Sequence, residues 1–298
     1  MRAVALAQVG GGAFSWNLLA DLQQMLAFAF MRNAFAAGTV VAVVGGIVGY
    51  FVILRRSAFA AHSLSHVGFS GAAGAALLSI APVWGLVVFC LGAAGVMGAL
   101  GGRLRERDTV IGIVLAFLLG VGVLFISLYS GYSTEAYSIL FGEILGVSST
   151  DVLTTLGLGA LTLLLLAVMY RPLLFCSVDE DVAEARGVPV HWLSVAFMAT
   201  LALAVAVAVQ VVGILLIFSL LVTPAAIADR FTNRPAAAMA ASVGVALACT
   251  WIGLAVAYYL PYPVSFFITS IAFSAYLAVR GWAWLARARR PQPAGSTV

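Results

Sequence analysis

The chain has 298 residues, of which 63% are hydrophobic and only 9% are charged. Soluble domains usually carry about 25% charged residues, so this composition excludes a soluble protein and indicates an integral membrane protein. All fifteen basic residues are arginine, and a phosphate-binding P-loop needs a lysine, so the chain cannot hydrolyse ATP by that route. The arginines lie in short loops between apolar runs, where charge orients a membrane protein, and do not indicate nucleic acid binding.

The apolar runs are unbroken over about twice the length of a barrel strand, which predicts an all-α, polytopic helical bundle. Residues 1–33 are a lead-in, in which residues 18–31 are expected to form an amphipathic helix at the membrane interface. Residues 34–280 form the transmembrane domain, and residues 281–298 form a C-terminal tail. About nine membrane-spanning helices are expected, at residues 34–54, 57–80, 83–101, 109–129, 152–170, 192–209, 211–228, 236–259 and 264–279.

Two segments between these helices differ from the rest. Residues 130–150 offer only about ten consecutive apolar residues, too few to cross the membrane, so we expect a short helix or a re-entrant segment there. Asp151 is then expected to be the N-cap of the next span. The polar segment at residues 171–191 is expected to contain a short surface helix that ends at Gly187, with a solvated loop as the alternative.

The distribution of arginine predicts the orientation of the chain. Nine spans put the two termini on opposite sides of the membrane. The arginines of the loops near residues 55, 103–107, 171–186, 230–234 and 280–290 all fall on one side. By the positive-inside rule this side is cytoplasmic, so the N-terminus is expected outside and the C-terminus in the cytoplasm.

Two of the three histidines, His62 and His66, lie four residues apart, which on a helix stacks them on one face about one turn apart. Apolar runs flank the pair, so we expect the imidazoles to face a pathway within the membrane, where an ionisable residue is costly and marks a candidate functional site. Neighbouring imidazoles can share one metal ion. The alternative is that each histidine is a hydrogen-bonded packing residue near the membrane interface.

Three further residues are weaker candidates. Glu143, in the short outer segment, is a candidate metal-attracting residue at the mouth of the pathway, or it caps that segment. Pro224 removes a backbone hydrogen bond from its helix and is either a hinge or a packing bend. His191 follows the polar segment and is interpreted as an interface residue and not as a metal ligand.

Four stretches of the chain, taken together and in order, resemble the permease subunits of zinc/manganese-type ABC importers. They read FMRNAFAAGTVVAVVGGIVGYFVILRRSAFAAHSLSHVGFSG, LFGEILGVSSTDV, SVDEDVAEARGV and VVGILLIFSLLVTPAAIADR. The resemblance implies a homodimeric permease in the lipid of the bacterial plasma (inner) membrane. It also implies two separate partners, a cytoplasmic ABC ATPase subunit and an extracytoplasmic metal-binding protein. The divalent transition metal is then the transported substrate, with no permanently bound cofactor.

The resemblance gives roles to two parts of the chain. The short helix expected in the polar segment corresponds to the family's coupling helix, which transmits ATPase closure to the spans. Its candidate coupling residues are Asp179, Glu180, Asp181, Ala183, Glu184 and Gly187.

The histidine pair departs from the family pattern. Where the family typically carries Asp-x-x-x-His on the second helix, this chain has two histidines. Imidazole nitrogens suit zinc and do not favour manganese, so Zn²⁺ is the expected substrate, with manganese or iron as alternatives. Two copies of the chain around a two-fold axis would bring up to four imidazoles together.

Two other classes of function are disfavoured. An ATP-independent secondary transporter or channel would usually place several acids or histidines inside its spans. Here the acids and histidines inside the predicted spans are almost only His62 and His66. A membrane metalloenzyme would need a general base within HSLSH, which contains no glutamate. The sequence therefore indicates a transporter subunit and not an enzyme.

Overall fold

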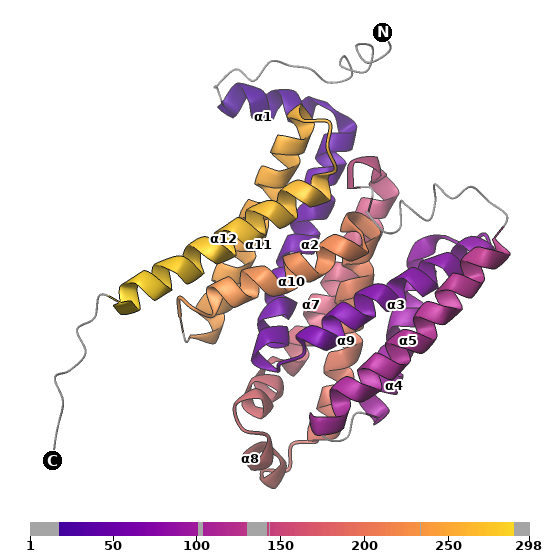
Figure 1. The fold of residues 1–298 in the computed structure, drawn as a ribbon, viewed down its shortest axis with the longest axis vertical. Coiled ribbons are helices and arrows are strands. Elements are labelled where there is room, and N and C mark those ends of the chain that lie inside the picture. Colours follow the sequence, from indigo (N-terminus) through magenta and orange to yellow (C-terminus); the bar gives the residue numbers. More distant parts are fainter. Residues whose placement is uncertain (1–17, 101–103, 130–141, 143, 233, 289–298) are drawn as a thin grey trace.

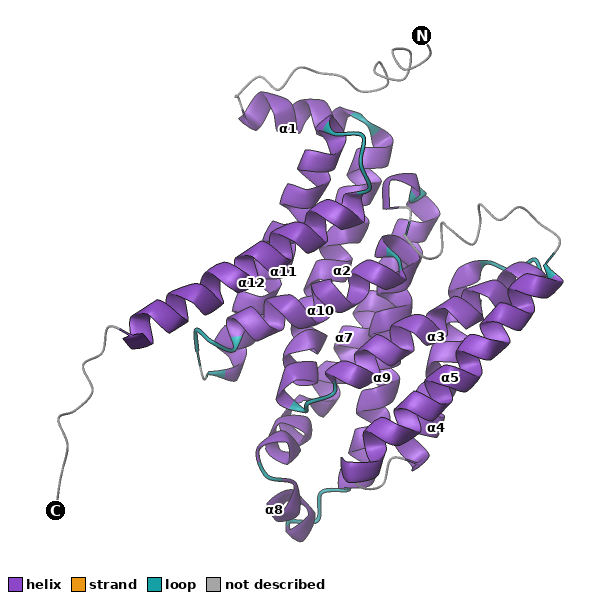
Figure 2. Ribbon diagram, viewed as in Figure 1, coloured by secondary structure: helices purple, strands orange, loops and turns teal. Residues whose placement is uncertain are grey.

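The computed structural model describes residues 18–100, 104–129, 142, 144–232 and 234–288. All regular structure in these ranges is helical, as predicted (Figure 1 and Figure 2). The elements are α1 (Leu18–Ala27), α2 (Ala29–Leu54), α3 (Ala58–Leu77), α4 (Pro82–Leu100), α5 (Leu104–Leu128), η1 (Ile144–Gly146), α7 (Ser149–Val178), α8 (Glu180–Ala185), α9 (Val190–Val212), α10 (Ile214–Ala228), α11 (Pro235–Tyr259) and α12 (Val264–Ala288).

Seven of the described helices are long and apolar enough to cross a membrane, namely α2, α4, α5, α7, α9, α11 and α12. The other two predicted spans correspond to α3 and α10. α3 has 20 residues, but its histidines and serines lower its hydropathy. α10 has only 15 residues, fewer than the roughly 20 that a span needs. The chain is therefore a multi-pass helical bundle, and the count of nine spans stays a prediction.

The interfacial helix predicted at residues 18–31 is shorter in the structure. α1 ends at Ala27 and α2 already begins at Ala29, five residues before the predicted start of the first span. The guanidinium group of Arg32 donates hydrogen bonds to the carbonyl oxygens of Leu26 and Ala27, both at 3.2 Å. These are carbonyl groups at the end of α1, so Arg32 stabilises the turn between the two helices.

Two other helices run further than predicted. The span predicted to end at residue 170 continues as α7 to Val178, with Pro172 inside the helix. A proline costs its helix a single backbone hydrogen bond, and the buried side chains of Leu173 and Cys176 hold the following turns against the bundle. The last span, predicted to end at residue 279, likewise continues as α12 to Ala288.

The start of α7 is a capping box, in which Asp151 does not have the predicted role. The N-cap is Ser148, whose hydroxyl accepts a hydrogen bond from the Asp151 N–H at 3.2 Å. Asp151 is the third helical residue, and its carboxylate accepts from the N–H and the hydroxyl of Ser148 at 3.1 and 2.6 Å. Each residue satisfies an orphan group of the other. The N-cap assignment is therefore wrong, and α7 begins at Ser149, three residues before the predicted start of the span.

The bundle is arranged around α2, α7 and α9 (Figure 1). α3, α4 and α5 pack together on one side, and α11 and α12 lie on the other. α10 packs against α2, α11, α12 and α3. α9 is buried continuously from Phe197 to Val209 apart from partly exposed Ala199, so it forms the centre of the core.

Small residues let the backbones of α3 and α4 approach closely. A Cβ atom added to Gly71 would collide with the carbonyl oxygen of Gly85, and one added to Gly85 would collide with that of Gly71. In lipid, helices associate mainly through such close packing. α3 is therefore fixed to α4 by a backbone contact that only glycine permits.

Replacing Gly71 with alanine is expected to destabilise the protein by about 1–3 kcal/mol, because overpacking forces the two backbones apart. Thermal unfolding in detergent measures the change. The matched control is Gly92→Ala on α4, where an added Cβ meets no atom within 4 Å. Equal melting temperatures for the two variants would contradict the importance of this contact.

Candidate functional site

The predicted histidine pair is assembled on α3. The ring centroids of His62 and His66 lie 4.6 Å apart, with the ring planes at 80°. Both residues are partly buried. The structure therefore confirms that the i, i+4 spacing brings the two imidazoles together on one helical face.

The pair belongs to a partly exposed stripe on α3. Phe59, His62, His66 and Phe69 follow one another at three- and four-residue intervals, whereas Ser63, Leu64 and Ser65 between them are buried. The stripe thus points away from the core of its own chain. In Figure 1 α3 itself lies between α10 and α5.

α10 supplies a neighbour that the sequence did not reveal. The ring of Phe218 lies 5.2 Å from that of His62 at an interplanar angle of 76°. Phe218 is 37% exposed, so it lies at the edge of the partly exposed stripe of α3. The close packing of α10 on α2 holds it there: a Cβ atom on Gly49 would collide with the carbonyl oxygen of Leu221.

The two imidazoles have no further metal ligands among their described neighbours. In the part of the chain that the structure describes, no three His, Cys, Asp or Glu side chains come together in a way that would hold a metal ion. The pair offers two nitrogen ligands on a face that its own chain leaves partly open. Glu143, the other candidate ligand, lies outside the described residues.

Gly213 separates α9 from α10, although it was expected inside the span predicted at residues 211–228. The predicted boundary was Gln210, but Gln210 lies inside α9, and the break is at Gly213, which has φ 80° and ψ 169°. Gly142, also with positive φ, packs so closely on this junction that a Cβ atom would collide with the carbonyl carbon of Val212. Only glycine suits both positions.

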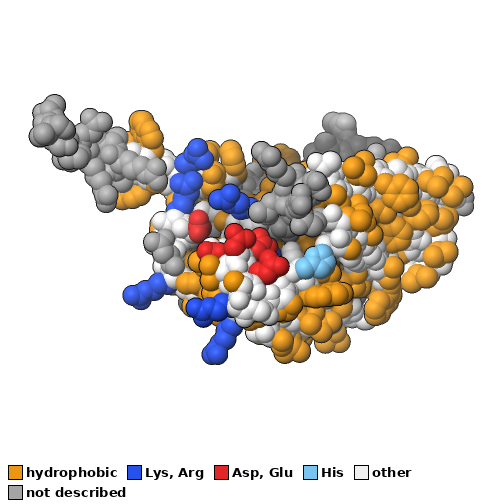
Figure 3. Space-filling model, turned by 90° about the horizontal axis from the view of Figure 1, so that it is seen from below, with side chains coloured by type: hydrophobic (Ala, Val, Ile, Leu, Met, Phe, Trp, Pro, Cys, Tyr) orange, Lys and Arg blue, Asp and Glu red, His pale blue; other side chains and the backbone are white. Residues whose placement is uncertain are grey.

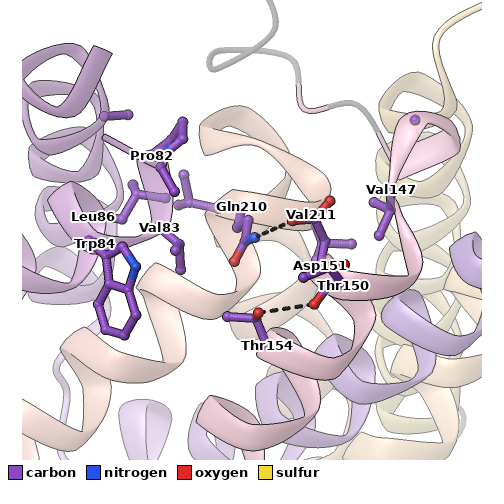
Figure 4. A pocket seen from close by; sticks show the side chains of 14 residues that line it. Pro82, Val83, Trp84, Leu86, Val147, Thr150, Asp151, Thr154, Gln210 and Val211 are labelled. Atoms are coloured by element: carbon purple, nitrogen blue, oxygen red, sulfur yellow. Dashed lines mark hydrogen bonds between the residues drawn. The ribbon is translucent and has the colours of Figure 1, made fainter. Parts of the chain in front are cut away.

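A cavity with several polar side chains in its wall lies beside the C-terminal end of α9, and sequence reasoning missed it (Figure 4). It has a volume of about 470 Å³ and is bounded by α3, α4, α7, α9 and the turn η1. The amide of Gln210 donates a hydrogen bond to the Asp151 carboxylate at 3.3 Å, and its buried Oε1 atom has no hydrogen-bond partner among the residues that the structure describes. Because these residues are 59 positions apart, no local signal in the sequence could have paired them.

The predicted short helix in the polar segment is α8. Asp179 is its N-cap, and its carboxylate accepts a hydrogen bond from the N–H of Val182 at 3.0 Å. Glu180, Asp181 and Glu184 are exposed, whereas Ala183 is fully buried and anchors the helix.

The end of α8 confirms the predicted role of Gly187 as a helix stop. Gly187 has φ 80°, and its N–H donates to the carbonyl oxygen of Glu184 at 2.9 Å. The N–H of Val188 donates to the carbonyl oxygen of Ala183 at 3.1 Å. This pair of bonds is a Schellman motif. At this end of the molecule the acidic side chains gather in a patch with arginines around it (Figure 3).

The two remaining candidates, Pro224 and His191, both lie in helices. Pro224 is buried inside α10, which is assigned as one helix on both sides of it, so the hinge role stays a prediction. His191 is exposed near the start of α9, with its ring 6.0 Å from that of Trp192.

The described chain is a multi-pass helical bundle whose helix α3 presents a histidine pair on a partly exposed face. The chain belongs to the ABC 3 transport family, whose model matches residues 27–281. The prediction of a permease and not an enzyme is thereby confirmed.

Similar proteins agree with this assignment. The manganese transport system membrane protein MntC of Halalkalibacterium halodurans is 33% identical over 73% of this chain and 75% of its own. The manganese import system permease protein ScaB of Streptococcus parasanguinis is 34% identical over 78% of this chain and 83% of its own. A solved structure of PsaBC from Streptococcus pneumoniae in complex with Fab aligns with a TM-score of 0.78 and 33% identity, covering 88% of this chain and 95% of that one. The chain is thus a metal importer permease.

Proposed function

We propose that this permease carries a divalent transition metal through an ATP-driven importer and that His62 and His66 form its transit site. The observation that supports this most directly is the imidazole pair, 4.6 Å apart, on the partly open face of α3. Ionisable residues at membrane depth are costly and usually serve substrate or ion pathways. A transit site must also release its ion, so a site whose ligands come from two chains suits it better than a closed four-ligand cage within one chain.

A second copy of the chain would complete the site. Zinc prefers four ligands in a tetrahedron, and one chain contributes two imidazoles. The stripe that carries them also exposes Phe59, and the neighbouring α10 exposes Phe218. A homodimer that joins these faces would bury the aromatic rings and bring two histidine pairs together.

Zinc is the metal that the ligands favour. Imidazole nitrogens suit zinc, whereas oxygen ligands suit manganese, and the pair contains only nitrogen. Manganese is the second candidate, because the named relatives MntC and ScaB are described as manganese permeases. Glu143 would add an oxygen ligand at the mouth of the pathway.

Two further subunits complete the proposed importer. The chain has no lysine for a P-loop, so ATP hydrolysis needs a separate ATPase, for which exposed α8 is the docking element. An extracytoplasmic binding protein would deliver the metal.

Co-expression with the importer's ATPase tests this assembly. We expect the two proteins to purify together, with two copies of each in the complex. A permease that transports metal in liposomes without any ATPase would instead establish an ATP-independent carrier.

The orientation follows from the arginines, with the N-terminus outside and the C-terminus in the cytoplasm. Single cysteines in a variant without Cys90, Cys176 and Cys249 test this by labelling of intact cells. We expect an impermeant reagent to label position 84 from outside and not position 186. The reverse pattern would overturn the orientation.

A further inference from the structure

We propose that a cleft on the lipid-facing side of the bundle binds an anionic phospholipid. This cleft, called the α7–α11 groove below, has a volume of about 590 Å³ and lies between α2, α7 and α11. Its volume falls within the range of about 300–1,000 Å³ that is usual for small-molecule sites. The inference depends only on the chain being a membrane protein and not on the metal it carries.

The groove exists because two helices pack on a third without packing on each other. α11 approaches α2 at Gly46, where an added Cβ would lie 2.8 Å from the Cα atom of Val243. α7 approaches α2 at Gly159, where it would lie 2.9 Å from a methyl group of Val40. α7 and α11 themselves share no extended contact among the described residues. α2 is therefore left as the floor, formed by Val43, Ile47 and Phe51.

The walls of the groove suit a hydrocarbon chain. Leu163, Leu166 and Ala167 of α7 face Met239 and Ala240 of α11, and no lining residue carries a charge. Leu164 and Val168, beside the groove on α7, are 61% and 75% exposed. Large apolar side chains exposed in this way mark the surface that faces lipid. An acyl chain can therefore enter from the membrane and lie along the floor.

Positive charge stands at one end of the groove. Arg171 follows Ala167 by four residues, so it continues the groove-facing stripe of α7 by one turn, and it is exposed. Arg234 is exposed and is the N-cap residue of α11. Tyr170 is the last lining residue along α7, and Met239 is the first along α11. Arg171 and Arg234 therefore both lie just beyond the same end of the groove.

The start of α11 adds to this charge. Among the described residues no side chain caps its first N–H groups, and Pro235 occupies the first turn. The amino end of a helix carries partial positive charge and attracts phosphate. Two guanidinium groups and a helix amino end at the rim of an apolar groove match the phosphate and acyl chain of an anionic phospholipid, and basic pockets between membrane helices bind such headgroups.

The test uses the full-length protein in nanodiscs of phosphatidylglycerol and phosphatidylcholine, with a photoreactive group on the acyl chain of one lipid at a time. We expect phosphatidylglycerol to cross-link preferentially, to residues of α7 and α11. Arg171→Gln and Arg234→Gln should each reduce this preference by about fivefold, the contribution of one basic residue near an anionic headgroup. Arg280→Gln on α12, which removes the same charge away from the groove, should leave it unchanged.

A second pair of variants separates the acyl chain from the headgroup. Ala167→Leu fills the groove and should reduce cross-linking of both lipids, whereas Ala160→Leu, at an exposed position on α7 outside the lining, should not. Arg171→Lys keeps the charge and should keep the preference for phosphatidylglycerol. That result would show that the loss in Arg171→Gln comes from the missing charge and not from misfolding. Equal cross-linking of the two lipids to the unchanged protein would overturn the proposal, as would capture of a second copy of the chain by the groove.

Discussion

Replacing either His62 or His66 with alanine is expected to reduce metal uptake by about tenfold or more. Loss of an outer-shell partner alone costs a metal site about 10–100-fold, and a direct ligand should cost at least as much. The protein should still insert and still bind its ATPase, because both side chains lie on the partly open stripe of α3 and not in the core. Uptake of zinc and of manganese in cells that lack other importers for either metal measures the effect.

The third histidine provides a matched control. His191 is exposed near the start of α9, far along the chain from the pair, so His191→Ala should leave the ratio of zinc to manganese uptake unchanged. Wild-type uptake by the double variant His62→Ala and His66→Ala would show that the pair is ordinary helix packing.

A third substitution addresses metal choice. His62→Asp restores the family's usual Asp-x-x-x-His pattern and exchanges a nitrogen ligand for oxygen. Transport should be retained, and the ratio of manganese to zinc uptake should rise. An unchanged ratio would place the selectivity of the importer elsewhere.

The second large effect is expected at α8. The double substitution Glu180→Arg and Asp181→Arg reverses two exposed charges in its first turn, and like charges facing each other across an interface cost several kcal/mol. ATP-dependent uptake should fall by about tenfold or more, while ATP hydrolysis by the partner subunit is no longer linked to transport. Uptake and hydrolysis are measured together in proteoliposomes.

Gly187→Val tests the same element through its backbone. A β-branched residue at φ 80° is strongly disfavoured, so the Schellman motif should be lost and the end of α8 should unwind. Asp108→Arg, a single charge reversal at an exposed position on α5, serves as the control and should transport normally. Normal coupling in the α8 variants would exclude it as the docking element.

Helices were predictable because a chain in lipid must satisfy its backbone groups internally. The histidine pair was predictable because the helical period alone sets which residues share a face. The stop at Gly187 was predictable because a positive φ at a helix end favours glycine.

The predictions were wrong where contacts between residues far apart in the sequence determine the structure. Pro172 does not end α7, because Leu173 and Cys176 are buried beyond it. The predicted boundary between two spans fell at Gln210, yet Gln210 lies inside α9 beside Asp151, which the fold brings there. The ring of Phe218 beside His62 depends on how α10 packs, and nothing in the local sequence encodes that.

The glycine junction between α9 and α10 bears on how the protein is made. α10 has 15 residues and is about 22 Å long, so by itself it falls short of the roughly 30 Å hydrocarbon layer. We expect it to insert together with α9 as a hairpin. The backbone at Gly213, with a φ of 80° that favours glycine, then needs protein against it. Gly142 packs against this backbone and precedes Gly213 in the chain. During synthesis Gly142 therefore leaves the ribosome before the backbone that it covers.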